Sequence, residues 1–203
     1  MTTPTTSSLR TGVISRVTKE TAIEITLALD GRGDTDVSTG LPFFDHMLDQ
    51  LGRHGSFDLN IEATGDLSID AHHTVEDVGI ALGETFAGAL GDKRGVRRFA
   101  SNVVPLDEAA VEIVLDLSGR PFFHYEVDFP GEKILGDPPF DPQLVEEFWR
   151  AFVTSAGVTL HIVGRRGKNT HHIIEAMFKG VARSLRDAVA VEGDVLPSTK
   201  GTL

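Results

Sequence analysis

The chain has 203 residues, of which 40% are hydrophobic, so it is long enough for one large domain or two small ones around an apolar core. Its formal net charge of −11 argues against a basic surface for nucleic acid or for an anionic membrane, so a phosphorylated ligand would need a local basic cluster. It contains no cysteine, which excludes disulfides and thiolate sites, leaves histidine and carboxylate as metal ligands, and is compatible with a cytoplasmic location.

The chain begins with a Thr/Ser-rich segment that has no apolar core. We expect a disordered tail at residues 1–9, and neither a signal peptide nor a membrane anchor. No apolar run elsewhere approaches membrane-spanning length.

The remaining residues predict two similar halves, at 10–93 and 94–203, separated by the glycine-rich junction Gly91–Gly95. In each half the pattern predicts, in chain order, an alternating strand, a helix start, a second strand and a long amphipathic helix. The matching segments are 22–32 with 110–120, 42–48 with 143–149, 57–63 with 158–164, and 75–89 with 174–188. The Pro-containing stretch 128–142 predicts a long loop. We therefore expect an α+β fold built from an internally duplicated unit.

The last helix of each half is preceded by one pattern, His-His-x-x-Glu, which occurs at His72-His73-x-x-Glu76 and at His171-His172-x-x-Glu175. If each pattern opens a helix, the first histidine and the glutamate share a face because they are four residues apart. Adjacent histidines are about 100° apart around the axis, so each pair should serve two ions or two neighbouring sites. A single pair would fit solvated helix-start residues equally well; the duplication favours metal binding.

The repeat also relates His46 to Glu147, because they precede Phe57 and Val158 by the same number of residues. If His46 binds a metal, we expect Glu147 to do so. The alternative is that His46 packs locally and that Glu147 belongs to a solvated acidic helix face.

The complete candidate ligand set combines imidazole and carboxylate donors without thiolate, which suits Mn, Fe, Co or Zn, and two ions fit it better than one. Its members are His46, His72, His73, Glu76, Glu147, His171, His172 and Glu175. Asp77 has no carboxylate counterpart in the second half, where Ala176 stands, and we expect it to orient a histidine.

Candidate phosphate-binding residues are Arg98, Arg120, Ser198 and Lys200. Guanidinium groups match phosphate oxygens in a bidentate manner, and the tail Pro197–Gly201 would add a hydroxyl and a point charge. A lysine near a chain end is otherwise usually just solvated.

From about Arg10 to its end, the chain resembles the imidazoleglycerol-phosphate dehydratase family of histidine biosynthesis. The motifs that carry the resemblance are Asp45–Met47, Ala71–Asp77, Gly91–Gly95, Leu117–Pro121, Gly167–Ala176 and Pro197–Gly201. It implies two four-stranded sheets with helices packed between them. It also implies a large homo-oligomer of cubic symmetry, about 24 subunits, with active sites between protomers.

The resemblance implies a reaction and roles for the residues. Imidazole glycerol phosphate loses water to give imidazole acetol phosphate, with two manganese ions per active site, through a metal-bound imidazolate and a diazafulvene-like intermediate. Glu20 and Glu175 resemble the acid/base pair, Glu20 and Gln50 contact the substrate, and Arg98, Arg120, Ser198 and Lys200 hold its phosphate. Some family members carry histidine at the position of Glu147, which leaves the metal preference open.

Three other functions can be weighed from the sequence. A two-metal phosphate-ester hydrolase would use a similar site, since paired ions also activate water. A metal-storage assembly is disfavoured because storage needs no phosphate-binding cluster, and DNA binding is disfavoured by the acidic charge.

Overall fold

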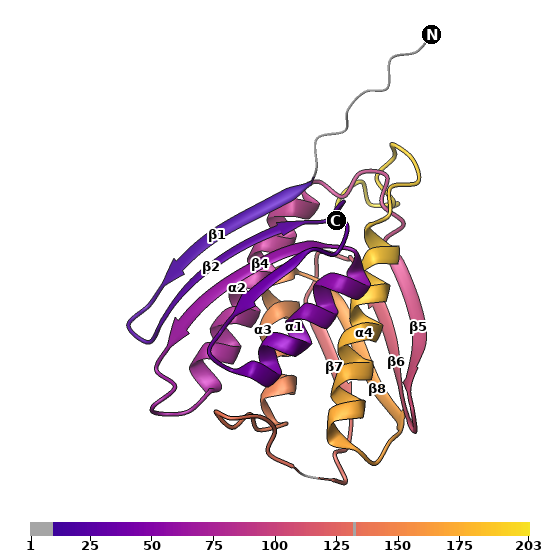
Figure 1. Cartoon of the computed structure of the whole chain (residues 1–203). Coiled ribbons are helices and arrows are strands. Elements are labelled where there is room, and N and C mark those ends of the chain that lie inside the picture. The colour runs from indigo at the N-terminus through magenta and orange to yellow at the C-terminus, as the bar shows by residue number, and fades with distance from the viewer. Residues whose placement is uncertain (1–9, 132) are drawn as a thin grey trace.

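The computed structural model describes residues 10–131 and 133–203; the predicted tail at residues 1–9 lies outside them. Two four-stranded sheets form the outer layers, and the helices pack between them (Figure 1). Helices α1 and α2 lie against the first sheet, and α3 and α4 lie against the second. Across the middle of the molecule α1 contacts α4 and α2 contacts α3, so helices of different halves pair with each other.

Both sheets have the same topology, as the internal duplication predicts. The first has the order β1-β2-β4-β3 and the second β5-β6-β8-β7, each with one parallel pair at the β3 or β7 edge. The strands are β1 Thr11–Val17, β2 Thr21–Ala28, β3 Thr35–Ser38, β4 Asp58–Gly65, β5 Phe99–Leu106, β6 Ala109–Asp116, β7 Phe122–Glu126 and β8 Thr159–Arg166. The four central strands were predicted, whereas the edge strands β1, β3, β5 and β7 were not.

The predicted helix starts are confirmed. The helices are α1 Pro42–Gly55, α2 His72–Leu90, α3 Leu144–Ala156 and α4 Thr170–Val189. Pro42 occupies the first turn of α1, where its missing N–H costs no hydrogen bond. At the start of α4 the side chain of Asn169 accepts a hydrogen bond from the His172 N–H, which caps the helix. Each His-His pair therefore opens a helix, as expected.

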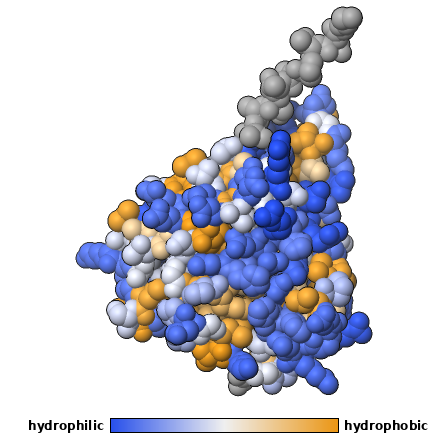
Figure 2. Space-filling model, in the orientation of Figure 1, coloured by the Kyte–Doolittle hydropathy of each residue, from blue (hydrophilic) through white to orange (hydrophobic). Residues whose placement is uncertain are grey.

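The outer faces of the sheets are partly apolar. Val13 and Val17 on β1 are 72% and 74% exposed, and Phe99, Val103 and Phe122 on the second sheet are each more than half exposed. The face seen in Figure 2 is mainly hydrophilic but carries separate hydrophobic patches. Among the described residues no helix is long and apolar enough to cross a membrane.

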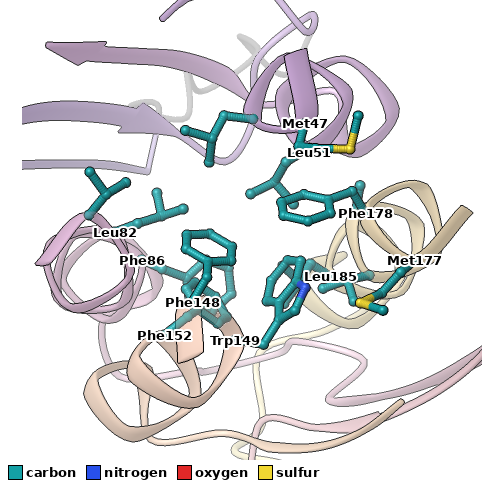
Figure 3. Packing of buried hydrophobic residues seen from close by; sticks show 14 of the residues in the cluster. Met47, Leu51, Leu82, Phe86, Phe148, Trp149, Phe152, Met177, Phe178 and Leu185 are labelled. Carbon is teal, nitrogen blue, oxygen red and sulfur yellow. The ribbon is translucent and has the colours of Figure 1, made fainter. Parts of the chain in front are cut away.

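One continuous core joins the two halves. Aromatic side chains from α2, α3 and α4 meet at its centre, where Phe148 and Trp149 of α3 pack against Phe178 of α4 (Figure 3). Leu51 of α1 and Phe86 of α2 belong to the same cluster, so every helix contributes. Burial of these side chains fixes the helices relative to one another and thereby fixes the residues at their N-terminal ends.

Candidate active site

One group of candidate metal ligands is formed across the two halves. His46 extends from α1, and His171 and Glu175 lie one turn apart on α4. Glu175 Oε2 is 2.9 Å from His171 Nε2 and 3.4 Å from His46 Nε2, and the three donor atoms lie within 4.8 Å of one another. Two ligands of one ion at about 2.1 Å and a right angle are about 3.0 Å apart. The geometry and the donor types of this group therefore fit a metal ion.

The corresponding group of the first half is more open. His72 Nε2 lies 4.0 Å from Glu76 Oε2 at the start of α2. Glu147 of α3 lines the same cavity as His72, with a volume of about 540 Å³. Glu147 is also 3.8 Å from Arg150 Nε. The repeat thus places His46 and Glu147 alike, each on a helix of one half beside the His-His helix of the other.

The second histidine of each pair points away from the first, as the helical rotation predicts. The ring centroids are 6.2 Å apart in the first pair and 6.3 Å apart in the second. His73 Nδ1 donates to Asp66 Oδ2 at 3.0 Å, and His172 Nδ1 donates to Glu108 Oε2 at 2.7 Å. These carboxylates raise the pKa of both imidazoles. The bond from His172, with N–H groups of Asn169 and Lys168, lowers the pKa of Glu108 to about 2.

Glu175 is held ionised by its neighbours. Burial raises the pKa of its carboxyl, but hydrogen bonds from Lys179 and His171 outweigh this and lower the pKa to about 2. Lys179 Nζ lies 2.6 Å from Glu175 Oε1, one turn further along α4. Lys179 was not predicted from the sequence, although its spacing from Glu175 is a sequence signal for an i,i+4 ion pair.

The predicted role of Asp77 is wrong. In the described part of the chain its carboxylate contacts no histidine; it accepts hydrogen bonds from Arg16 at 2.9 Å and from the hydroxyl of Thr21. Asp77 is only 8% exposed because this face of α2 packs against β1 and β2. It therefore ties α2 to the hairpin that carries Glu20, whose Oε2 lies 3.8 Å from His73 Nδ1.

Gln50 lies one turn after His46 on α1, so it extends the same helix face. Its Oε1 is 3.2 Å from Nε2 of His54. Burial, followed by the charges of Lys179 and Arg183 on α4, lowers the pKa of His54. The side chains of Gln50 and His54 therefore follow the seam between α1 and α4 away from the candidate metal group.

The candidate phosphate-binding residues gather elsewhere in the chain. Arg98 forms a bidentate pair with Asp116 at 2.7 and 3.1 Å and donates to the Pro197 carbonyl at 2.7 Å. Ser198 Oγ accepts from the backbone N–H of Lys200, which shapes the tail. Arg120 lies after β6, where its guanidinium donates to the Ser118 carbonyl. The structure thus places Arg98 in contact with the C-terminal tail.

The C-terminal tail, which Arg98 contacts, and the start of α4, which carries His171, lie at opposite ends of α4 (Figure 1). The Arg98 N–H donates to the carbonyl of Ala188 near the end of the helix, whereas His171 lies at its start. At about 1.5 Å per residue, these ends are roughly 25 Å apart. A single chain therefore does not bring the cluster and the histidines together.

Open space adjoins both histidine groups. The cavity beside His72 and Glu147 is also lined by Ile134 and Pro139 of the predicted loop 128–142. A second cavity, of about 640 Å³, adjoins His171 and Glu108. A third, of about 360 Å³, lies within the loop region and contains no predicted site residue. The loop therefore forms one wall of the space beside the first histidine group.

The fold and these groups define a class: duplicated α+β proteins in which paired histidine helices could hold metal ions, with a separate basic cluster. A family model described as imidazoleglycerol-phosphate dehydratase matches residues 39–185. A protein of that name from Gluconacetobacter diazotrophicus is 57% identical over 199 residues, covering 96% of this chain and 98% of the relative. One from Methanopyrus kandleri is 52% identical over 197 residues, covering 97% and 98%.

Solved structures agree. The crystal structure of imidazoleglycerol-phosphate dehydratase from Staphylococcus aureus has a TM-score of 0.79 at 37% identity, covering 89% of this chain and 99% of that one. The crystal structure of IGPD from Pyrococcus furiosus in complex with (S)-C348 has a TM-score of 0.80 at 35% identity, covering 94% and 100%. The chain belongs to the imidazoleglycerol-phosphate dehydratase family, and it is a hydro-lyase of histidine biosynthesis.

Proposed function

We propose that this protein dehydrates imidazole glycerol phosphate to imidazole acetol phosphate in a metal-dependent reaction in the cytoplasm. The observation that carries the proposal is the group of His46, His171 and Glu175, whose donor atoms lie within 4.8 Å of one another. Its counterpart at His72, Glu76 and Glu147 supports a second ion. Metal ions bound there supply Lewis-acid activation of the imidazole ring of the substrate.

The donor chemistry is compatible with manganese, which we propose as the metal. Imidazole and carboxylate without thiolate suit a metal of intermediate hardness, and two such groups support two ions per active site. His73 and His172 point away from the two groups, so in our proposal they complete metal sites together with ligands of neighbouring protomers.

Glu20 is the proposed proton-transfer residue. It is half exposed on the β1–β2 hairpin, and its carboxylate lies 3.8 Å from His73 Nδ1, beside the proposed metal site. Glu175 is ionised at neutral pH, so its carboxylate can accept a proton but has none to donate at the start of the reaction. Glu20 and Glu175 together form the proposed acid/base pair.

We expect Glu20→Gln to lower turnover by at least ~10²-fold without loss of bound manganese. The control is Glu84→Gln, an exposed glutamate of α2, which should turn over normally. The assay incubates each protein with imidazole glycerol phosphate and measures both the ketone product and free phosphate. Free phosphate without ketone would support the two-metal hydrolase instead, and normal turnover of the Glu20 variant would remove Glu20 from the mechanism.

The separation of the basic cluster from the histidines supports an active site shared between protomers. In the proposal, Arg98, Arg120, Ser198 and Lys200 of one copy hold the phosphate of a substrate whose ring lies at the histidines of another. The apolar outer faces of the sheets support extensive contact between copies, because exposed patches of this kind mark interaction surfaces. We therefore propose a large homo-oligomer, and the resemblance to the family implies about 24 subunits.

A mixing experiment tests the shared site. Arg98→Ala and His171→Ala variants should each be inactive as homo-oligomers, for lack of the phosphate contact or the metal ligand. After dissociation and co-assembly, some sites would combine an intact cluster from one variant with intact histidines from the other, so activity should return. Each variant put through the same procedure alone is the control. Mixed oligomers that remain inactive would contradict a site shared between copies.

A further inference from the structure

The outward-pointing histidines of the two halves share one detail. In both, the Nδ1 atom of the ring faces a carboxylate: His73 donates to Asp66 at 3.0 Å, and His172 donates to Glu108 at 2.7 Å. A neutral imidazole has one protonated and one unprotonated nitrogen. A carboxylate at Nδ1 keeps the proton on that nitrogen and leaves the Nε2 lone pair free for a metal ion.

The two carboxylates do not correspond to each other in the repeat. Asp66 lies in the connection between β4 and α2, whereas Glu108 lies in the hairpin between β5 and β6. The equivalent of Glu108 in the first half is Glu20, since the segments that start at Ala22 and Ala110 align. The connection between β8 and α4 is only Gly167-Lys168-Asn169, so the second half has no carboxylate in the place of Asp66.

Glu108 is held firmly in its position. Its Oε1 accepts the backbone N–H groups of Lys168 and Asn169 at 3.0 and 2.8 Å, while Oε2 accepts from His172. Glu20 in the first half is less constrained: its carboxylate is 3.8 Å from His73, and its side chain is 53% exposed. The two hairpin glutamates therefore occupy equivalent positions but make different contacts.

We infer that Glu108 and Asp66 are positioning residues that set the tautomer and orientation of His172 and His73 for metal binding. The inference rests on the proposed metal dependence. The two equivalent hairpin glutamates therefore have different roles. In the second half Glu108 orients a histidine. In the first half Asp66 orients the histidine, so Glu20 is available to the substrate. Carboxylates behind metal-binding histidines commonly act in this way.

Glu108→Gln separates this role from a purely structural one. The glutamine carbonyl can still accept the N–H groups of Lys168 and Asn169, but its NH₂ group then faces His172 Nδ1 and donates to it. The proton of the ring moves to Nε2, the atom required for metal. Both oxygens of Asp66 face His73 Nδ1, so an asparagine could still present its carbonyl there; Asp66→Ala instead removes the acceptor. Glu20→Gln is the matched control because Glu20 lies beyond hydrogen-bond distance of His73.

The experiment measures Mn²⁺ affinity by competition with a chelator, and the histidine tautomers by ¹⁵N NMR of the metal-free protein. We expect about 10- to 100-fold weaker Mn²⁺ binding for Glu108→Gln and for Asp66→Ala. Glu20→Gln should bind Mn²⁺ as the unmodified protein does. The NMR signals of His172 should report a proton on Nδ1 in the unmodified protein and on Nε2 in Glu108→Gln.

Unchanged Mn²⁺ affinity of Glu108→Gln would overturn the inference and leave the proposed function intact. Weakened affinity with an unchanged His172 tautomer would also overturn it, because the role of Glu108 would then be structural. Weakening by Glu20→Gln equal to that of Asp66→Ala would refute the division of roles. An unmodified protein that binds no Mn²⁺ would instead refute the proposed metal dependence.

Discussion

The contact between α2 and α3 depends on two glycines of α2, and replacing one of them provides a quantitative test. A Cβ atom added at Gly83 would lie 2.6 Å from the carbonyl oxygen of Phe152 and 2.8 Å from Ser155 Cβ. A Cβ at Gly79 would lie 2.7 Å from the carbonyl oxygen of Phe148. To restore ordinary contact, Gly83→Ala must move α3 away from α2 by roughly 0.7 Å.

The magnitude follows from two opposing effects. Overpacking a close contact costs about 1–3 kcal/mol, and the higher helix propensity of alanine returns about 1 kcal/mol. Gly83→Ala should therefore lower the free energy of unfolding by about 0–2 kcal/mol. Gly88 lies on the same helix with no atom within 4 Å of an added Cβ, so Gly88→Ala should raise it by up to about 1 kcal/mol.

Urea unfolding of both variants in excess chelator measures this difference, which we expect to be about 1–3 kcal/mol. The same displacement moves Glu147 of α3 relative to His72 of α2, so Gly83→Ala should also bind Mn²⁺ more weakly than Gly88→Ala. A Gly83→Ala protein as stable as Gly88→Ala would show that the helices are not packed as closely as described.

Two further predictions concern carboxylates outside the metal groups. Asp77→Asn should destabilise the fold by about 1–3 kcal/mol and lower turnover with Mn²⁺ retained, because the hydroxyl of Thr21 loses its ionised acceptor and the hairpin of Glu20 loosens; unchanged thermal unfolding would contradict this. Hydrogen bonds from backbone N–H groups lower the pKa of Asp58 below 3.8, and the bond from Arg32 has the largest effect. Its stabilising contribution is then complete above pH 3.8 and is lost as the pH falls through the folded-state pKa. The free energy of unfolding of Asp58→Asn should therefore approach that of the unmodified protein as the pH is lowered. A difference in this free energy that does not change with pH would refute the argument.

Much of the fold could be predicted from local pattern. Helical periodicity and strand alternation are properties of a few neighbouring residues, so the central strands, the helix starts and the duplication were all predicted correctly. The edge strands were not predicted because their side chains alternate between half-buried and exposed, and because β3 has only four residues. The divergence of His171 from His172 was also predictable, since it follows from the rotation per residue in a helix.

The sequence by itself determined which residue types repeat and which helix face each one occupies. Only the tertiary structure decided their partners. Asp66 and Glu108 reach equivalent histidines from unrelated connections, and Asp77 faces the hairpin although it lies one turn after His73. Nor does sequence spacing reveal that Arg98 contacts the C-terminal end of α4, whereas His171 lies at the start of that helix. Such pairings depend on how layers of helices and sheets pack, and packing joins residues whose separation along the chain carries no periodic signal.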